Sequence, residues 1–165
     1  MSKLLAARMT ADYDGPLVVF IIGMRINRLF KVAKWLPVVR AMGPMIAELE
    51  RDPRSGFLGW QPMLAGLRTV LLVQYWRDFD SLETYSRARD KQHWPAWAAF
   101  NKAIGTDGSV GIFHETYVVA PGGHETVYVN MPPFGLGRVG KLVGAEGSRR
   151  DARERMKQAG GAADG

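Results

Sequence analysis

The stretch Val70-Leu71-Leu72-Val73-Gln74-Tyr75-Trp76 decides the fold, together with His93-Trp94-Pro95-Ala96-Trp97 and Gly111-Ile112-Phe113-His114-Glu115-Thr116-Tyr117. The first and third segments are apolar runs rich in β-branched and aromatic residues, which indicates strands, and a helix is expected between them. Each segment carries an aromatic residue or a histidine in an apolar frame. Together they predict an aromatic-lined pocket for a small apolar or aromatic molecule. A hydrolase would need a poised nucleophile or paired acids instead.

The pattern of apolar residues in the rest of the sequence predicts elements in the order β-α-β-β-α-β, with one extra strand. Strands are expected at 17–27, 57–63, 68–76, 110–120 and 126–130. This order is typical of an α+β fold, the ferredoxin-like antiparallel sheet with helices on one face. The other face needs cover, and a partner sheet is the simplest cover, so we expect a homodimer.

Two helical regions complete the pattern. The first spans Leu29 to Leu49, with a break expected near Trp35–Pro37 because proline removes a backbone donor. The second begins at Asp80, which fits a capping box with Glu83, and continues as a further helical piece at 95–104. Residues 1–15 are expected to be a lead-in, 16–138 the folded domain and 139–165 a disordered tail of glycine, alanine and charged residues.

Composition excludes several classes of function. Apolar residues make up 47% of the chain and charged residues 23%, which is typical of a globular protein. The absence of cysteine excludes disulfides, thiolate nucleophiles and zinc–cysteine sites. The net charge is +6, but the basic residues are scattered, so no nucleic-acid partner is expected. The apolar run 17–26 is half the length of a membrane span, and no signal peptide precedes it, so we expect a cytoplasmic protein without a membrane partner.

The candidate site residues each have a structural and a functional interpretation. His114 either makes hydrogen bonds at a sheet or subunit interface or contacts a ligand, and it points away from Glu115 because strand side chains alternate. His93 and Trp97 are one helical turn apart, and they either pack against the sheet or stand at a pocket mouth. A pocket would take its walls from Trp76, Trp97 and Phe100, although aromatic clusters are also ordinary core. Tyr75 and Asn27 are candidates to orient a substrate oxygen.

Several cofactor signatures are missing from the sequence. It has no dinucleotide fingerprint, phosphate loop or nucleophile elbow. Its three histidines do not have the spacing of a recognised metal site. We therefore expect no dedicated organic cofactor and no metal.

The sequence carries a series of short motifs: Phe20–Asn27, Lys34–Pro37, Val73–Trp76, the group His93, Trp97 and Phe100, Gly111–Tyr117 and Glu125–Pro132. Over about 16–138, this series resembles the monooxygenase-like domain family named after a fungal fumagillin-pathway enzyme. The resemblance implies a dimeric α+β barrel, the fold of small antibiotic-biosynthesis monooxygenases, which often use O₂ without metal or flavin.

A more distant resemblance concerns haem. Haem-degrading monooxygenases carry an asparagine on the first strand, a tryptophan on a middle strand and a histidine on the second helix, and Asn27, Trp76 and His93 are similar in place. Aldoxime dehydratases of related fold also hold haem through a histidine.

Three functional hypotheses follow. The first is an oxygenase for a hydrophobic or aromatic substrate, with catalytic His93, Tyr75 and Asn27 and with substrate contacts from Trp76, Trp97, Phe100 and His114. The second is a non-catalytic dimeric module that binds a small ligand. The third is a haem-binding protein of the same fold.

Overall fold

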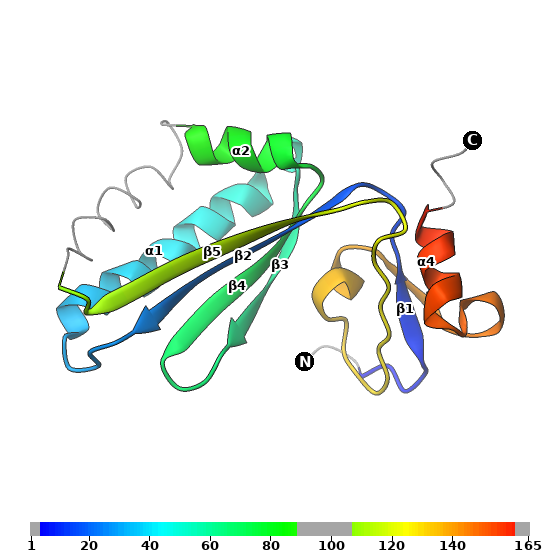
Figure 1. The fold of residues 1–165 in the computed structure, drawn as a ribbon, viewed down its shortest axis with the longest axis horizontal. Coiled ribbons are helices and arrows are strands. Elements are labelled where there is room, and N and C mark those ends of the chain that lie inside the picture. Colours follow the sequence, from blue (N-terminus) through cyan, green and yellow to red (C-terminus); the bar gives the residue numbers. More distant parts are fainter. Residues whose placement is uncertain (1–3, 89–106, 161–165) are drawn as a thin grey trace.

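The computed structural model describes residues 4–88 and 107–160 (Figure 1). A four-stranded antiparallel sheet in the order β3-β4-β2-β5 forms its larger part. Helices α1 (Val32–Arg51) and α2 (Phe79–Arg87) cover one face of this sheet. The predicted ferredoxin-like α+β arrangement is therefore confirmed. The strands are β2 (Leu17–Ile26), β3 (Phe57–Leu64), β4 (Thr69–Trp76) and β5 (Val110–Val119).

Strand β2 holds the sheet together because it pairs along its length with both β4 and β5. Phe20 lies opposite Gln74 on one side and Thr116 on the other. The strand has ten residues, and all of them except Arg25 are apolar, as expected for a central strand of the sheet. Strand β5 is an edge of the sheet among the described strands.

The core lies between the sheet and the two helices. Val18 and Trp76 from the sheet meet Leu49 of α1 and Leu82 of α2 in one cluster. A second cluster brings Met24 and Val110 of the sheet against Val38 of α1. Since side chains alternate along a strand, all four of these sheet residues project from the face that the helices cover.

Helix α1 runs through Pro37 and Pro44 without interruption, so the predicted break near Trp35–Pro37 is wrong. The two carbonyls that lose a donor to proline are those of Ala33 and Arg40. Both residues are exposed, and both prolines are exposed as well. Water can therefore satisfy these carbonyls, and the buried residues on the opposite side of the helix keep it in place.

Helix α2 begins two residues earlier than predicted, because its cap is Asp78 instead of Asp80. The Asp78 Oδ1 atom accepts a hydrogen bond from the backbone N–H of Ser81 at 2.6 Å. Asp80 lies in the first turn, where its charge favours the helix N-terminus.

A small lobe beside the main sheet joins the two ends of the described chain (Figure 1). Strand β1 (Met9–Asp12) pairs with β6 (Lys141–Gly144), and helix α4 (Ala152–Gly160) follows. The disorder predicted for 139–165 is therefore wrong for residues up to 160. The strand predicted at 126–130 is also absent from the described structure, where Tyr128 makes only an isolated bridge to Met9.

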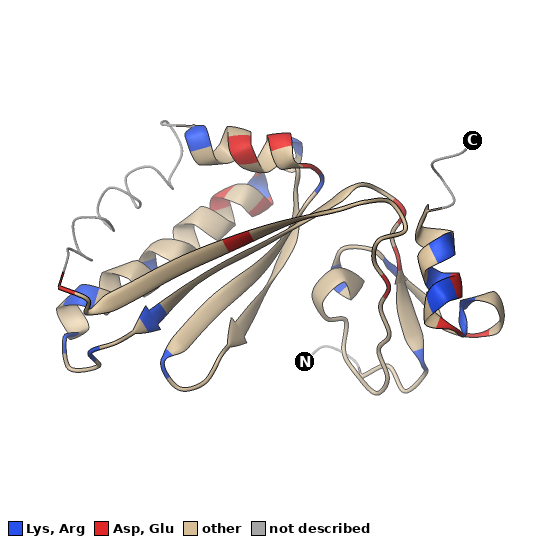
Figure 2. Ribbon diagram, in the orientation of Figure 1, with Lys and Arg blue, Asp and Glu red and all other residues tan. Residues whose placement is uncertain are grey.

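A buried arginine explains why a charge-rich segment is folded. Arg155 of α4 is 7% exposed. Its Nε and Nη2 atoms donate to Glu125 Oε2 at 2.9 and 2.6 Å, and its Nη1 atom donates to the carbonyls of Arg149 and Arg150 at 3.0 and 2.7 Å. Figure 2 shows the basic residues around α4. One of them is thus an internal link, whereas composition suggested only a solvated basic tail.

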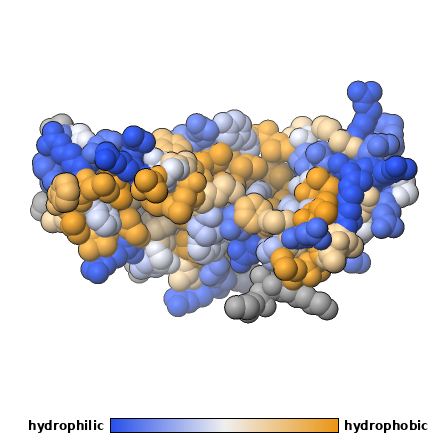
Figure 3. Space-filling model, turned by 90° about the horizontal axis from the view of Figure 1, so that it is seen from below, coloured by the Kyte–Doolittle hydropathy of each residue, from blue (hydrophilic) through white to orange (hydrophobic). Residues whose placement is uncertain are grey.

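The small lobe also reaches the second face of the main sheet. The short helix η2 (Gly135–Arg138) lies beside β3, where Arg138 Nη1 donates to the Trp60 carbonyl at 3.4 Å. Figure 3, which views the molecule from below, shows hydrophobic residues spread over this side between hydrophilic ones. The chain therefore covers part of the face that was assigned to a partner. None of the described helices has the length and apolar character to cross a bilayer.

Candidate functional site

A large apolar cavity of about 1370 Å³ lies between the sheet and the two helices. Its floor is a regular grid, because antiparallel pairing places residues of the four strands side by side in rows. From β3 across to β5, the rows are Trp60, Gln74, Phe20 and Thr116; then Pro62, Leu72, Ile22 and His114; then Leu64, Val70, Met24 and Ile112.

The roof of the cavity comes from the apolar side of α1. Met42, Met45 and Ile46 face the sheet there, and Leu82 of α2 closes one end. Methionine adapts its shape to irregular surfaces, so such a roof suits a bulky apolar ligand. Acidic groups appear at the rim, where Glu50 accepts a hydrogen bond from the Trp60 indole N–H at 2.8 Å.

Three polar residues interrupt the apolar floor, and Gln74 is the most buried of them. Gln74 is 6% exposed. Its Oε1 atom accepts a hydrogen bond from the Trp76 indole N–H at 3.0 Å. The Nε2 atom has no hydrogen-bond partner in the described parts of the chain. Because Gln74 lines the cavity, this amide is a polar feature of an otherwise apolar surface.

His114 and Thr116 lie at the opposite, more open side of the floor on strand β5. The His114 ring is 5.7 Å from the ring of Phe20, at an interplanar angle of 40°. Both β5 side chains are exposed. His114 is thus accessible both to a ligand in the cavity and to solvent.

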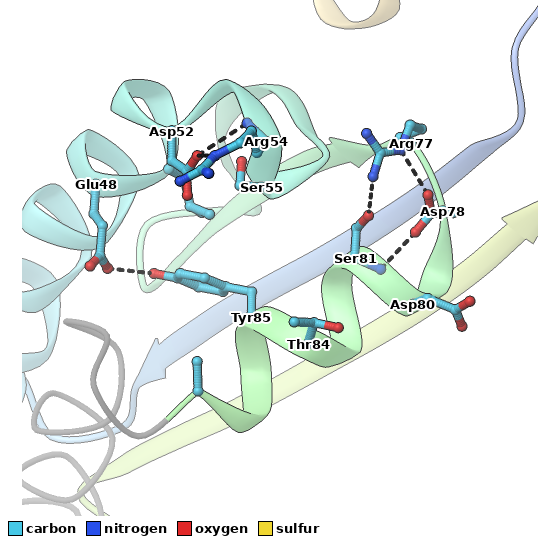
Figure 4. A pocket seen from close by; sticks show the side chains of 12 residues that line it. Glu48, Asp52, Arg54, Ser55, Arg77, Asp78, Asp80, Ser81, Thr84 and Tyr85 are labelled. Atoms are coloured by element: carbon cyan, nitrogen blue, oxygen red, sulfur yellow. Dashed lines mark hydrogen bonds and ion pairs between the residues drawn. The ribbon is translucent and has the colours of Figure 1, made fainter.

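A second, polar cleft of about 430 Å³ lies where the end of α1 meets the start of α2 (Figure 4). Its charged groups pair with each other. Arg77 donates to Asp78 at 2.8 Å and to Ser81 at 3.0 Å, and Tyr85 donates to Glu48 at 3.3 Å. These pairs stabilise the helix ends and explain the cleft without a ligand.

The titratable groups of this cleft follow from the same contacts. The hydrogen bond from Arg77, followed by those from Ser81, lowers the pKa of Asp78 to about 2. Burial, together with the nearby Glu48 carboxylate, raises the pKa of Tyr85 well above its ordinary value. Tyr85 therefore stays protonated at neutral pH and acts as a donor. Its ring packs on Trp76 with the centroids 5.8 Å apart.

Trp76 and Tyr75 were predicted to serve one pocket, and the structure separates them. Trp76 lines the cavity, but it is fully buried and packs edge-on against Phe57 at 5.2 Å. Tyr75 projects from the other face of β4, beside η2, because neighbouring strand residues point to opposite sides. Burial there raises the pKa of Tyr75. Tyr75 therefore cannot orient a molecule in this cavity.

Asn27 also lies away from the cavity. It follows the end of β2, is exposed, and donates through Nδ2 to the Gly108 carbonyl at 3.0 Å. Trp76 pairs with Val18 at the opposite end of β2. The two positions are therefore roughly nine residues, or about 30 Å, apart along the strand. Asn27 holds the loop before β5 in place.

The haem-type arrangement does not fit the described residues. Asn27 and Trp76 are too far apart to contact one bound haem, and the histidine of that resemblance, His93, lies outside the described residues. His114 is the cavity histidine that the structure does describe, and its ring stacks beside Phe20. The described residues therefore do not form the haem site of that resemblance. No cluster of three potential metal ligands occurs within 4–88 and 107–160.

Of the other predicted site residues, His93, Trp97 and Phe100 lie outside the described residues. His114 lines the cavity, and its contact with a substrate stays a prediction. Sequence reasoning missed Gln74 and Phe20. The sequence did carry a signal for Gln74. This residue directly follows the apolar stretch Val70–Val73, and its side chain can form hydrogen bonds whereas those of the stretch cannot.

Comparison with solved structures places the fold among known proteins. An aldoxime dehydratase in complex with butyraldoxime matches 96% of this chain and 45% of its own, with a TM-score of 0.61 and 17% identity. A second aldoxime dehydratase matches 93% of this chain and 44% of its own, with a TM-score of 0.57 and 18% identity. SnoaB, a cofactor-independent oxygenase from Streptomyces nogalater, matches 64% of this chain and 95% of its own, with a TM-score of 0.46 and 12% identity. At these identities the likeness concerns the fold alone.

Comparison of sequences identifies the family. Monooxygenase af470 of Aspergillus fumigatus is 30% identical over 133 residues, which cover 75% of this chain and 46% of the fungal protein. The chain thus spans about half the length of this curated relative. The family described as monooxygenase af470-like matches residues 17–136, which contain the whole cavity floor. The chain therefore belongs to the monooxygenase af470-like family.

Proposed function

We propose that this protein binds a small, mainly hydrophobic and aromatic molecule in the apolar cavity and oxidises it with O₂, without a dedicated organic cofactor. The observation that carries the proposal is the cavity itself. Its volume of about 1370 Å³ exceeds the roughly 300–1,000 Å³ of common ligand sites. Its floor is apolar apart from Gln74, His114 and Thr116. Membership of a monooxygenase-like family supports an oxidation over another reaction.

His114 is the described residue best placed to move a proton in such a reaction. It faces the cavity next to Phe20 and is open to solvent, so a proton taken from a bound phenol or enol can leave the site. From the sequence resemblance alone, His93 remains a second candidate for this role, with Trp97 and Phe100 as further walls.

A turnover experiment tests the proposal. Purified protein is supplied with a panel of phenols, enols and polycyclic ketones in an oxygen electrode, and products are analysed by mass spectrometry under ¹⁸O₂. We expect oxygen uptake and the incorporation of ¹⁸O with at least one member of the panel. His114→Gln should reduce turnover strongly while changing the melting temperature little, because the side chain is exposed. If compounds of the panel bind but none of them causes oxygen uptake, the oxygenase proposal is wrong and the protein is a binding module.

The haem alternative has a direct spectroscopic test. Purified protein mixed with haem should show no Soret shift that saturates at one haem per chain. A saturating shift that His93→Gln removes would establish haem binding and contradict the proposed cofactor-independent reaction.

We also propose that the protein is a homodimer. One face of the main sheet is covered only in part by η2, and the edge strand β5 exposes Tyr117 at 52% and Val118 at 72%. A second copy placed there would bury over about 1,000 Å², as stable interfaces do. Light scattering should give twice the chain mass at micromolar concentration. A monomer at that concentration would contradict the dimer.

A further inference from the structure

We propose that Gln74 is the specificity residue of the cavity and that it selects apolar ring molecules carrying a ketone-type carbonyl oxygen. The inference rests on the proposed function, since it assumes that the cavity holds the substrate. It adds the substrate class and the residue that recognises it.

The orientation of the Gln74 amide follows from its neighbour. An indole N–H can only donate a hydrogen bond, so the amide atom that faces Trp76 at 3.0 Å must be the oxygen. The NH₂ group is therefore the free end. It has two donor hydrogens and no partner among the residues that the structure describes.

Burial makes this donor selective. Gln74 is 6% exposed, and its neighbours across the strands are Trp60 and Phe20, both aromatic. Along its own strand the same face continues with Leu72 and Trp76. A ligand that fills this region without an acceptor displaces water from the NH₂ group and leaves it unpaired. A ligand with an acceptor oxygen at this point restores the hydrogen bond, which is a strong basis for discrimination.

The charge of the lining indicates which acceptor fits. The ionic groups that line the described cavity are Glu50, Glu83 and Arg87, two acids and one base. None of these three lies on the sheet floor beside Gln74. Among the described residues, a carboxylate beside Gln74 would therefore lack a counter-ion, which is costly. A neutral carbonyl needs only the hydrogen bond that Gln74 offers.

Fluorenone and fluorene form a matched pair of probes for this test. They share one fused-ring skeleton, and fluorenone carries a carbonyl where fluorene has a CH₂ group. Their association constants are measured by equilibrium dialysis against the full chain. The readout is the ratio of the fluorenone constant to the fluorene constant, so that their different hydrophobicity cancels between protein variants.

In Gln74→Met we expect this ratio to fall by about threefold to tenfold, the range of one neutral hydrogen bond. Fluorene affinity should remain within about twofold, which shows that the cavity is intact. The control is Gln61→Met on the adjacent strand β3, where the side chain projects from the other face and its Nε2 atom donates to the Pro62 carbonyl. Its ratio should equal that of the wild type.

A second variant covers the loss of the Trp76 partner. The double variant Gln74→Met/Trp76→Phe removes the indole N–H together with its acceptor, so no donor is left without a partner and the ratio should fall here too. An unchanged ratio in both variants, with both probes bound, overturns the selection by Gln74 and leaves the ligand cavity standing. Failure of wild-type protein to bind either probe contradicts the proposed function and this inference together.

Discussion

Replacement of Arg155 by methionine should release the C-terminal helix from the small lobe. Arg155 donates four hydrogen bonds, two to Glu125 Oε2 and one each to the carbonyls of Arg149 and Arg150. Its side chain is 6% exposed, whereas that of Glu125 is 33% exposed. Methionine fills a similar volume but donates nothing, so both the turn before α4 and the link to Glu125 lose their partner.

The size of the effect follows from the burial of the two partners. Breaking a fully buried ion pair by removing one partner costs about 3–5 kcal/mol. Here water can hydrate the Glu125 carboxylate and the two carbonyls after the lobe relaxes, which lowers the cost to about 2–3 kcal/mol. At about 1.4 kcal/mol per factor of ten, the opening equilibrium of the lobe should rise by roughly 30-fold to 150-fold.

Hydrogen exchange followed by mass spectrometry measures this opening directly. Protection of amides in β6 and α4 should fall by that factor, while amides in β2 and β4 keep their protection and serve as an internal reference. The control is Lys157→Met on the same helix, whose ion pair with Glu154 is 65% exposed on the lysine side. It should change protection less than about threefold. Protection in Arg155→Met within threefold of the wild type would refute the anchoring role of Arg155.

Three further predictions concern stability and are measured by urea denaturation. Gly56→Ala should cost about 1–3 kcal/mol more of the free energy of unfolding than Gly66→Ala. The two glycines have nearly the same φ, 76° and 78°, so the backbone strain is the same in both variants. Only at Gly56 does an added Cβ collide with the Ser81 side chain. Trp76→Leu should cost about 3 kcal/mol, since the ring is fully buried and its N–H holds Gln74. The wild type should lose stability relative to Asp78→Asn as pH falls from about 4 to 2. Folding lowers the pKa of Asp78 from 3.8 to about 2, so the stabilisation by its carboxylate is complete above this pH window and is lost within it. The loss should stay below about 1 kcal/mol, since the ion pair is exposed. A constant difference between these two proteins over that pH range would show that the carboxylate adds nothing.

The main sheet could be predicted from the sequence because each strand is a continuous apolar run. The predicted strand 68–76 is observed as Thr69–Trp76, and 110–120 as Val110–Val119. The sequence carries no comparable signal for the pairing of β1 with β6 in the small lobe. Strands β1 and β6 have four residues each, and a polar helix is held by the single buried Arg155. Burial of one ionic group depends on a distant partner, Glu125, which composition cannot reveal.

The site was predicted in part because alternation was applied to one strand and not to another. On β5 the alternation correctly separates His114 from Glu115. Applied to β4, the same rule places Trp76 with Gln74 and sends Tyr75 to the opposite face. Gln74 escaped notice because a glutamine in a strand is usually solvent-exposed, and only the register with Phe20 and Trp60 shows that it is enclosed.

The pairing of β1 with β6 has a consequence for the order in which the chain folds. Met9 pairs with Gly144, so this contact closes a loop that contains the entire main sheet. During synthesis all strands from β2 to β5 leave the ribosome before β6 does, and the sheet is able to fold while β1 is still unpaired. The β1–β6 pairing can therefore form only after the sheet strands have been made, and until then β1 has its bridge to Tyr128 on one edge and open backbone groups on the other.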